Sequence, residues 1–265
     1  MTIRAPLHFF SRGEGPPLLL IHGFAGHGAG WRRVAAHLPN SRETAALTLP
    51  GHDPACPIPE GAGFEDLVDS IARLLEGEFD LPIEAAGYSL GARVALGLLV
   101  RHPGILERAT LIGVNPGIAD GEGRRERARW DGEWARRIRD EGIEAFSSRW
   151  EDLPLFATQR DLPEEVLEEQ RAIRLRHDAP SLARAMTALG LAAMPDYRSA
   201  LPSIRVPVRL VAGEKDTKFL SLAREMADVL RASEMAVLPG VGHNIPLEAP
   251  SVLASLLRGG RPSRS

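Results

Sequence analysis

The pentapeptide Gly87-Tyr88-Ser89-Leu90-Gly91 is the stretch that decides the fold, and Arg93 follows it closely. A G-x-S-x-G pattern between a strand and a helix forms a nucleophile elbow, a sharp turn that lifts the serine hydroxyl above the sheet. The apolar run 83–86 predicts a buried strand before the turn, and residues 90–101 predict an amphipathic helix after it. The elbow therefore predicts where a reaction takes place.

Short apolar runs alternate with helical patterns on both sides of the elbow. The further predicted strands are 7–10, 17–21, 44–49, 109–114, 208–212 and 235–238, and the further predicted helices are 31–38, 64–75, 219–230 and 250–257. Such alternation is typical of a mostly parallel sheet with helices on both faces. We expect an α/β fold of this kind, and 265 residues are enough to bury a sizeable core in one domain.

The alternation stops between residues 119 and 195, where the sequence is charged and predicts helices only. We expect this stretch to be a helical cap, inserted after the strand near 109–114. The core would then consist of residues 1–118 and 196–265, and the whole chain would be one structural domain with an insertion. Ordinary surface helices are the alternative to a cap over the active site.

Composition excludes several classes of function. A formal net charge of −3 argues against nucleic acid as the main partner. Cys56 is the single cysteine, so an internal disulfide and a cysteine-based zinc site are excluded. No apolar run reaches the length of a signal peptide or a membrane span, so we expect a cytoplasmic protein. The histidines follow no metal-binding spacing and the glycine-rich stretch 23–30 lacks a phosphate-loop ending, so we expect neither metal nor cofactor.

Serine becomes a useful base or nucleophile only when a neighbour accepts its proton. Asp216 and His243 each follow a predicted strand, in the chain order of serine, acid and histidine that this elbow requires. Because the carboxyl ends of parallel strands share one edge of a sheet, we expect Ser89, Asp216 and His243 to meet there. His243 would accept the proton and Asp216 would orient the imidazole. Glu214 is the alternative acid.

Two further stretches point to the same edge. His22-Gly23-Phe24 follows the strand 17–21, and the backbone N–H groups of Phe24 and Leu90 are the expected donors to a developing oxyanion. Lys215 and Lys218 are the only lysines of the chain. Their position in one loop indicates a site that uses an ammonium group rather than a guanidinium.

Together with Pro50-Gly51-His52, these motifs resemble the α/β-hydrolase superfamily. Within it, about residues 15 to 255 resemble the 2-succinyl-6-hydroxy-2,4-cyclohexadiene-1-carboxylate synthases of menaquinone biosynthesis. The narrower part of the match consists of Arg93, Asn115-Pro116-Gly117, Arg124, Arg127, Asp131, Trp134, Phe146, Trp150, and residues 154–156, 213–219 and 242–244.

The resemblance implies a lyase that eliminates pyruvate from a cyclohexene carrying succinyl, carboxylate and enolpyruvyl groups. Ser89 would act as a base through His243, and no acyl-enzyme is required. The family match implies a polycarboxylate substrate bound by Arg93, Arg127, Arg174, Trp150, Lys218 and Tyr88. Arginine suits carboxylates because its planar group donates two parallel hydrogen bonds. Arg124 is the alternative to Arg127, and a surface ion pair is the alternative role for each arginine.

Two residues depart from the family pattern. Asp53 stands where glycine usually follows Pro-Gly-His, and Glu151 follows Trp150 where some members have an aromatic residue. A carboxylate at Glu151 would oppose an anionic substrate if it faced the pocket. Two other functions stay open: a carboxylesterase or carbon–carbon bond hydrolase that uses Ser89 as a covalent nucleophile, and a receptor of the same fold without catalysis.

Overall fold

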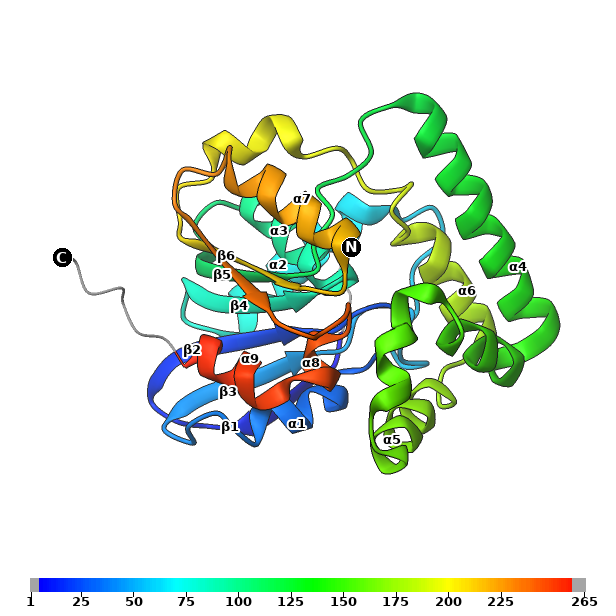
Figure 1. Cartoon of the computed structure of the whole chain (residues 1–265). Helices are drawn as coiled ribbons and strands as arrows, with labels where there is room; N and C mark the ends of the chain where they lie inside the picture. The colour runs from blue at the N-terminus through cyan, green and yellow to red at the C-terminus, as the bar shows by residue number, and fades with distance from the viewer. Residues whose placement is uncertain (1–4, 259–265) are drawn as a thin grey trace.

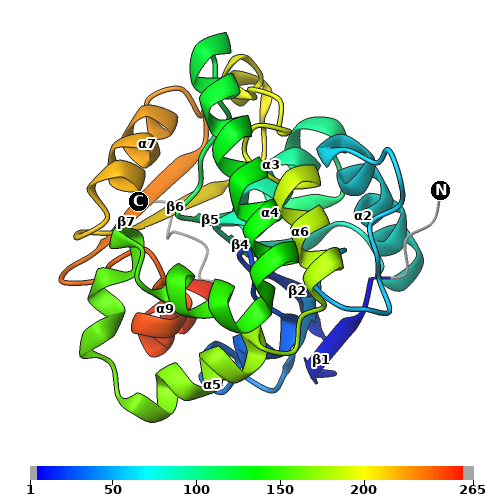
Figure 2. The ribbon, with the colours of Figure 1, turned by 90° about the vertical axis from the view of Figure 1, so that its right-hand side faces the viewer.

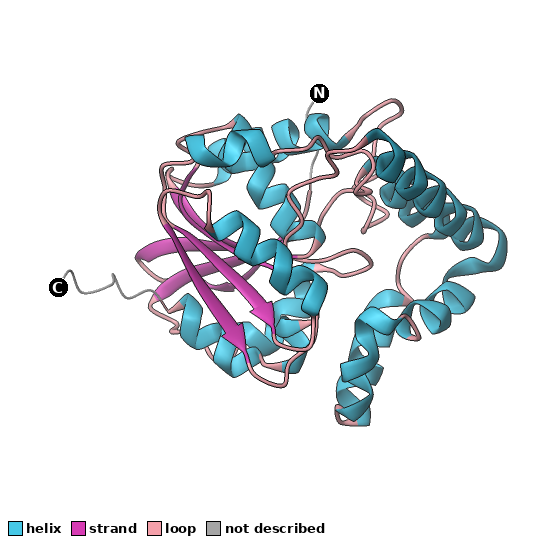
Figure 3. Cartoon of the chain, turned by 45° about the horizontal axis from the view of Figure 1, so that its top comes forward, coloured by secondary structure: helices cyan, strands magenta, loops and turns pink. Residues whose placement is uncertain are grey.

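A seven-stranded sheet with the strand order β1-β3-β2-β4-β5-β6-β7 forms the centre of the protein, whose computed structural model describes residues 5–258. The strands are β1 (Leu7–Ser11), β2 (Gly15–Ile21), β3 (Arg42–Leu47), β4 (Ile83–Tyr88), β5 (Leu106–Ile112), β6 (Val208–Gly213) and β7 (Ser233–Leu238). Among these strands β1 alone is antiparallel to its neighbour. Figure 3 shows the sheet between two layers of helices.

The helices of the core connect strands or follow β7, and they cover both faces of the sheet (Figure 1). They are the 3-10 helix η1 (Gly28–Trp31), α1 (Arg32–Ala35), α2 (Phe64–Glu78), α3 (Leu90–Arg101), the 3-10 helix η3 (Arg198–Ser203), α7 (Thr217–Ala227), α8 (Ile245–Glu248) and α9 (Pro250–Leu257). The described residues include no helix that is both long and apolar enough to cross a membrane.

The two faces of the sheet bury alternate residues of each strand, as the geometry of a strand requires. In β2, Leu19 and Ile21 belong to the apolar cluster that also contains the buried residues of α2, α3 and α7. Leu18 and Leu20 point to the other face and pack with Trp31, α8 and α9. A run of consecutive apolar residues is therefore needed in β2, because both of its faces are buried.

Several element boundaries differ from the sequence predictions. The helix predicted over 31–38 is only α1, because His37 and Leu38 close i→i+3 bonds to Val34 and Ala35 and tighten the chain after it. The strand predicted over 44–49 ends at Leu47, and the one predicted over 109–114 begins at Leu106. These are shifts of boundaries, and each element exists with the predicted type.

The segment between β5 and β6 contains α4 (Gly121–Glu151), the 3-10 helix η2 (Pro154–Asp161), α5 (Glu164–Arg174) and α6 (Ala179–Ala188), which we call the cap. Helix α4 is interrupted at Gly142, where φ is 83°. Trp134, Phe146 and Trp150 pack with apolar residues of α6 in a cluster of their own. Figures 1 and 2 show α4 and α6 standing beside the edge of the sheet where the parallel strands end.

Candidate active site

Ser89 lies in the turn between β4 and α3 and has a left-handed backbone conformation, with φ 52° and ψ −106°. The turn is so tight that a Cβ atom added at Gly87 would lie 2.3 Å from the carbonyl oxygen of Gly91. One added at Gly91 would lie 2.1 Å from the carbonyl oxygen of Ile21. Both glycines of the pentapeptide are therefore required for α3 to pack against the strands behind the serine.

The structure brings together the three side chains that the sequence predicts as a catalytic triad. The His243 Nε2 atom lies 3.1 Å from Ser89 Oγ, and its Nδ1 atom lies 2.6 Å from Asp216 Oδ2. His243 and Asp216 are buried. The alternative acid, Glu214, instead accepts a hydrogen bond of 2.8 Å from the Gly240 N–H. The geometry is that of a relay in which His243 can take a proton from Ser89 while Asp216 holds its other nitrogen.

Aromatic rings and one glycine fix the orientation of the His243 ring. The ring centroids of Phe219 and Tyr88 lie 4.4 Å and 5.3 Å from that of His243. On another side Gly113, with φ +59°, comes so close that an added Cβ atom would lie 2.8 Å from His243 Cε1. The sequence analysis did not identify Gly113 or Phe219, although Phe219 closes the matched stretch 213–219. Gly113 could have been identified as a glycine that directly follows a buried strand.

Ser89 opens into a cavity of about 640 Å³ between the core and the cap. Phe24 and Leu90, the residues predicted to supply the oxyanion donors, both line it. Leu90 is the first residue of α3. The N–H groups in the first turn of a helix have no hydrogen-bond partner inside the helix, so the Leu90 N–H is not used within α3. The cavity can therefore present a backbone donor close to the serine, as stabilisation of an oxyanion requires.

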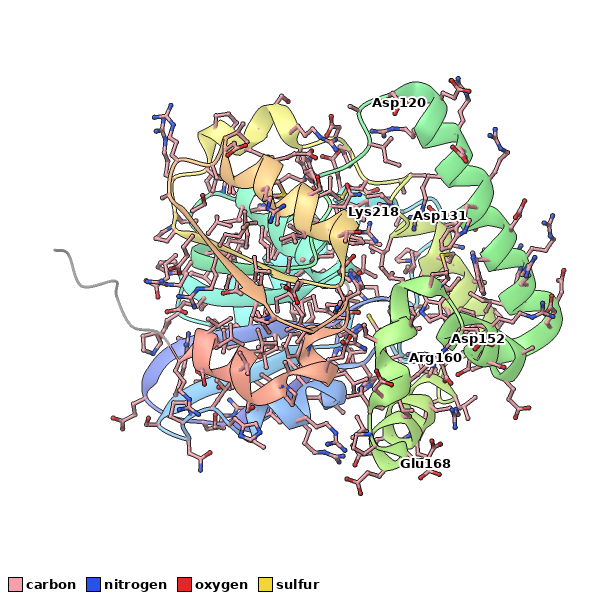
Figure 4. All side chains as sticks on the ribbon, in the orientation of Figure 1. Asp120, Asp131, Asp152, Arg160, Glu168 and Lys218 are labelled. Atoms are coloured by element: carbon pink, nitrogen blue, oxygen red, sulfur yellow. The ribbon has the colours of Figure 1, made fainter. Side chains whose placement is uncertain are left out.

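Three cationic side chains reach this cavity from different elements: Arg93 from α3, Arg127 from α4 and Lys218 from α7. Figure 4 shows Lys218 at the end of α7 that faces the cap. The exposed carboxylate of Glu126 also lines the cavity and was not predicted from the sequence. The cavity has more positive than negative side chains, so it favours anions.

Arg93 is a buried cation that donates a hydrogen bond of 2.8 Å to the carbonyl oxygen of Leu189. Within residues 5–258 no carboxylate lies within 4.0 Å of its guanidinium. The pKa of Arg93 is lowered to about 9, first by burial and then by the charge of Arg127, whereas Asp131 opposes the shift. A buried positive charge without a partner is costly unless an anion reaches it, so Arg93 is a candidate anion-binding group.

Arg127 already has an acidic partner on its own helix. Its Nε atom lies 2.8 Å from Asp131 Oδ1, and its guanidinium lies over the Trp130 ring, 4.4 Å from the centroid. Burial raises the pKa of Asp131, and Arg127 opposes that rise. Arg124, the alternative to Arg127, instead donates to the Ile118 carbonyl oxygen and does not line the cavity.

Arg174 does not join Arg93 and Arg127 in the lining of the Ser89 cavity. It lines a neighbouring cavity of about 120 Å³, and Trp150 and Tyr88 belong to the walls of both. Its Nη1 atom donates to Glu151 and, over 3.2 Å, to Ser147 Oγ. Glu151 thus faces an arginine, and neither cavity includes it in its lining. Convergence of all three arginines above the serine is not seen in this structure.

The other departure from the family pattern is a loop residue away from Ser89. Asp53 accepts a hydrogen bond of 2.8 Å from the Ala55 N–H and lies 3.6 Å from His27 Nε2. It does not line the Ser89 cavity. Across the described part of the chain, no three His, Cys, Asp or Glu side chains are grouped so that they could hold a metal ion.

Comparisons with known proteins agree with this architecture. Residues 18–256 match the alpha/beta hydrolase family. The chain is 34% identical over 91% of its length, and 90% of the relative's, to 2-succinyl-6-hydroxy-2,4-cyclohexadiene-1-carboxylate synthase of Enterobacter sp. strain 638. These matches confirm the α/β-hydrolase fold and the resemblance predicted from the sequence.

Two solved structures extend the comparison. The MenH structure from S. aureus has a TM-score of 0.89, 28% identity and 97% coverage of both chains. A malate-bound thermophilic esterase from Thermogutta terrifontis has a TM-score of 0.81 and 27% identity, covering 96% of this chain and 92% of its own. The chain belongs to the alpha/beta hydrolase family and, within it, to the family of 2-succinyl-6-hydroxy-2,4-cyclohexadiene-1-carboxylate synthases.

Proposed function

We propose that this protein eliminates pyruvate from a cyclohexene that carries succinyl, carboxylate and enolpyruvyl groups, and so forms 2-succinyl-6-hydroxy-2,4-cyclohexadiene-1-carboxylate. The observation that carries the proposal is the buried Arg93, a cation with no carboxylate partner in the described chain, in the same cavity as Ser89, which is bonded to His243. Family membership supports the same reaction. We place the protein in the cytoplasm and take a small polycarboxylate as its partner.

In the proposed mechanism Ser89 removes a proton from the ring, and His243 Nε2, 3.1 Å from Ser89 Oγ, takes the hydroxyl proton. Asp216 stabilises the imidazolium that forms. The electron pair of the broken C–H bond delocalises towards the succinyl ketone, where the N–H groups of Phe24 and Leu90 bind the negative oxygen.

The second half of the reaction breaks the bond between the ring and the enolpyruvyl oxygen. The delocalised pair forms a new ring double bond, and the electrons of the C–O bond leave with enolpyruvate. Ser89 now carries the ring proton as its hydroxyl proton. His243 therefore gives its extra proton to the departing enolpyruvate, which becomes pyruvate, and the relay returns to its starting state. Arg93, Arg127 and Lys218 are the proposed partners of the substrate carboxylates, because ionised acceptors form the strongest hydrogen bonds with such donors.

Pyruvate release tests the proposed function directly. The purified protein is mixed with the enolpyruvyl substrate, and pyruvate is followed with time. We expect release well above the spontaneous rate, with loss of the catalysed part in Ser89→Ala. Release at the spontaneous rate only would refute the proposal.

A covalent hydrolase is the second candidate, because the Ser89–His243–Asp216 geometry also suits acyl transfer. An esterase among the similar structures supports it. Mass spectrometry after mixing with p-nitrophenyl esters separates the two mechanisms. An acyl group on Ser89 and a burst of nitrophenol favour the hydrolase, whereas the lyase needs neither.

A further inference from the structure

Glu151 is the last residue of α4 and lies between two arginines of α5. Its Oε1 atom accepts hydrogen bonds from Arg174 and, over 3.1 Å, from Ser147. Its Oε2 atom lies 3.0 Å from Nη2 of Arg171. Nε of Arg171 also lies 3.4 Å from Oε1 and 3.3 Å from Oε2, so Arg171 bonds both oxygens and Arg174 bonds Oε1.

The two arginines lie in different surroundings. The side chain of Arg174 is 6% exposed, and its Nε atom is buried without a hydrogen-bond partner within residues 5–258. The side chain of Arg171 is 43% exposed. Removal of Glu151 from Arg174 would still leave the carboxylate paired with Arg171 at the surface. Replacing Glu151 by another carboxylate at Arg174 is thus less costly than breaking an isolated buried ion pair, because that would leave a buried charge without a partner.

Arg174 is close to the Ser89 cavity although it does not line it. The smaller cavity that it does line has Phe24, Tyr88, Trp150 and Phe156 in common with the larger one. Those four aromatic side chains are the wall between the two spaces. A ligand in the larger cavity whose carboxylate extends between these side chains would meet Arg174. The Nε donor of that guanidinium has no partner in the described part of the chain.

We propose that Glu151 is a specificity-determining residue that competes with a substrate carboxylate for Arg174. Ligands without a carboxylate in this position leave the Glu151–Arg174 pair intact and gain nothing from the arginine. A ligand with one must displace Glu151, which weakens its binding by the free energy of that pair. The inference rests on the proposed function for its substrate.

Glu151→Gln is the decisive substitution, because it removes the competing charge and preserves the size of the side chain. We expect KM for the enolpyruvyl substrate to fall about threefold to tenfold with kcat unchanged. A rise in KM would mean that Glu151 positions Arg174 for the substrate, and an unchanged KM would mean that Arg174 takes no part. Either result overturns the inference.

Arg171→Ala should shift KM in the opposite direction. Without Arg171 the Glu151 carboxylate loses its surface partner and pairs with Arg174 alone, so KM should rise about twofold to threefold. In the Glu151→Gln background the same substitution should change nothing, because the competing carboxylate is gone. Glu168→Gln, also on α5 and exposed (Figure 4), is the matched control for loss of one negative charge and should leave KM unchanged.

A binding measurement separates failure of this inference from failure of the proposed function. Propane-1,2,3-tricarboxylate is titrated calorimetrically into the wild-type protein and Glu151→Gln, with acetate as the monocarboxylate control. Tighter binding of the tricarboxylate by Glu151→Gln supports competition even if the wild type releases no pyruvate. Equal or weaker binding overturns competition even if pyruvate release is normal.

Discussion

The sheet edge and the cap present their functional groups in different states. At the sheet edge Ser89, His243 and Asp216 are already bonded to one another in the order that proton transfer requires. In the cap, by contrast, Arg127 and Arg174 are bonded to acids of the cap itself. Arg93, which comes from the core helix α3, is the buried arginine that donates only to a carbonyl oxygen.

This difference separates the two tasks of the site. A preformed proton relay lowers the barrier because its groups need no reorganisation during the reaction. Arginines with internal partners gain little from a substrate carboxylate, because each new pair replaces an old one. We therefore expect the rate of the chemical step to depend on the sheet edge, and the choice of substrate to depend on how the cap releases its arginines.

The largest expected effect comes from Ser89→Ala. Removal of the base should lower kcat for pyruvate release by about 10²- to 10⁴-fold, the range typical of general base catalysis. KM should change little, because the cationic residues remain. The matched control is Ser221→Ala on α7, where the hydroxyl bonds Glu225 away from the cavity. A variant of Ser89 with more than a tenth of the wild-type kcat would show that the relay is not the proton acceptor.

Arg93→Ala should lower kcat/KM by about 10- to 100-fold, the value of a charge-assisted hydrogen bond to the substrate. Its Tm should stay unchanged or rise, because the folded protein no longer holds a buried unpaired charge. Arg101→Ala, at the exposed end of the same helix, is the control, since Arg101 pairs with Asp69 and Glu65. A large fall in Tm for Arg93→Ala would assign Arg93 a structural role instead.

Gly113→Ala tests how strictly the sheet edge holds His243. The added methyl group would lie 2.8 Å from His243 Cε1, so the ring must move and kcat should fall about tenfold. Gly104→Ala is a close control, because Gly104 also has a positive φ, +107°, but an added Cβ atom there meets nothing within 4 Å. Both variants carry backbone strain. If the two lose activity equally, strain rather than the position of His243 is responsible.

The smallest expected effect is a pH dependence of stability from buried histidines at the sheet edge. Burial lowers the pKa of His22 to about 3. The Leu49 N–H donates to Nε2 and the Nδ1–H bonds the Gly23 carbonyl oxygen, so the ring is neutral. Below the ordinary pKa of about 6.5 the unfolded chain takes up a proton that the folded protein does not, so stability is complete above that pH and declines as the pH falls towards 3.

Between pH 7 and 6 this contribution amounts to about 0.7 kcal/mol for His22. His22→Gln keeps an acceptor for the backbone and removes the titrating group, so urea unfolding should show a weaker decline in stability over this interval. Ser70→Ala removes a buried side-chain hydrogen bond to the Asp66 carbonyl oxygen but no titrating group, so it should keep the wild-type decline. Equal slopes in His22→Gln and the wild type would contradict the assignment.

The parts of the site that could be predicted from the sequence are those fixed by local backbone geometry. The elbow specifies Ser89. Asp216 and His243 each follow a strand closely, and they reach the same edge of the sheet because the parallel strands all end there. Helix α3 begins and ends at the predicted residues because the elbow turn precedes it and Pro103-Gly104 follows it. Periodicity was less informative at α1, where short 3-10 bonds end the helix early.

The ion pairs of the cap could not be predicted, because they depend on how separate helices pack. Glu151 and Arg174 are 23 residues apart and belong to different helices. No local pattern says that an acid at the end of α4 meets an arginine at the end of α5. The sequence showed Glu151 as a departure from the family, but whether it faces a substrate or an arginine depends on the break at Gly142 and the course of η2.

The aromatic cluster of the cap has a practical consequence for measurements. Of the four tryptophans, Trp130, Trp134 and Trp150 lie within about 6 Å of one another, whereas Trp31 is buried in the core. Trp150 borders both cavities, so its indole emission should respond to a ligand in either one. The protein therefore carries its own fluorescent reporter of occupancy. Trp31 lines only the smaller cavity, so it is a reference only for ligands that stay in the Ser89 cavity.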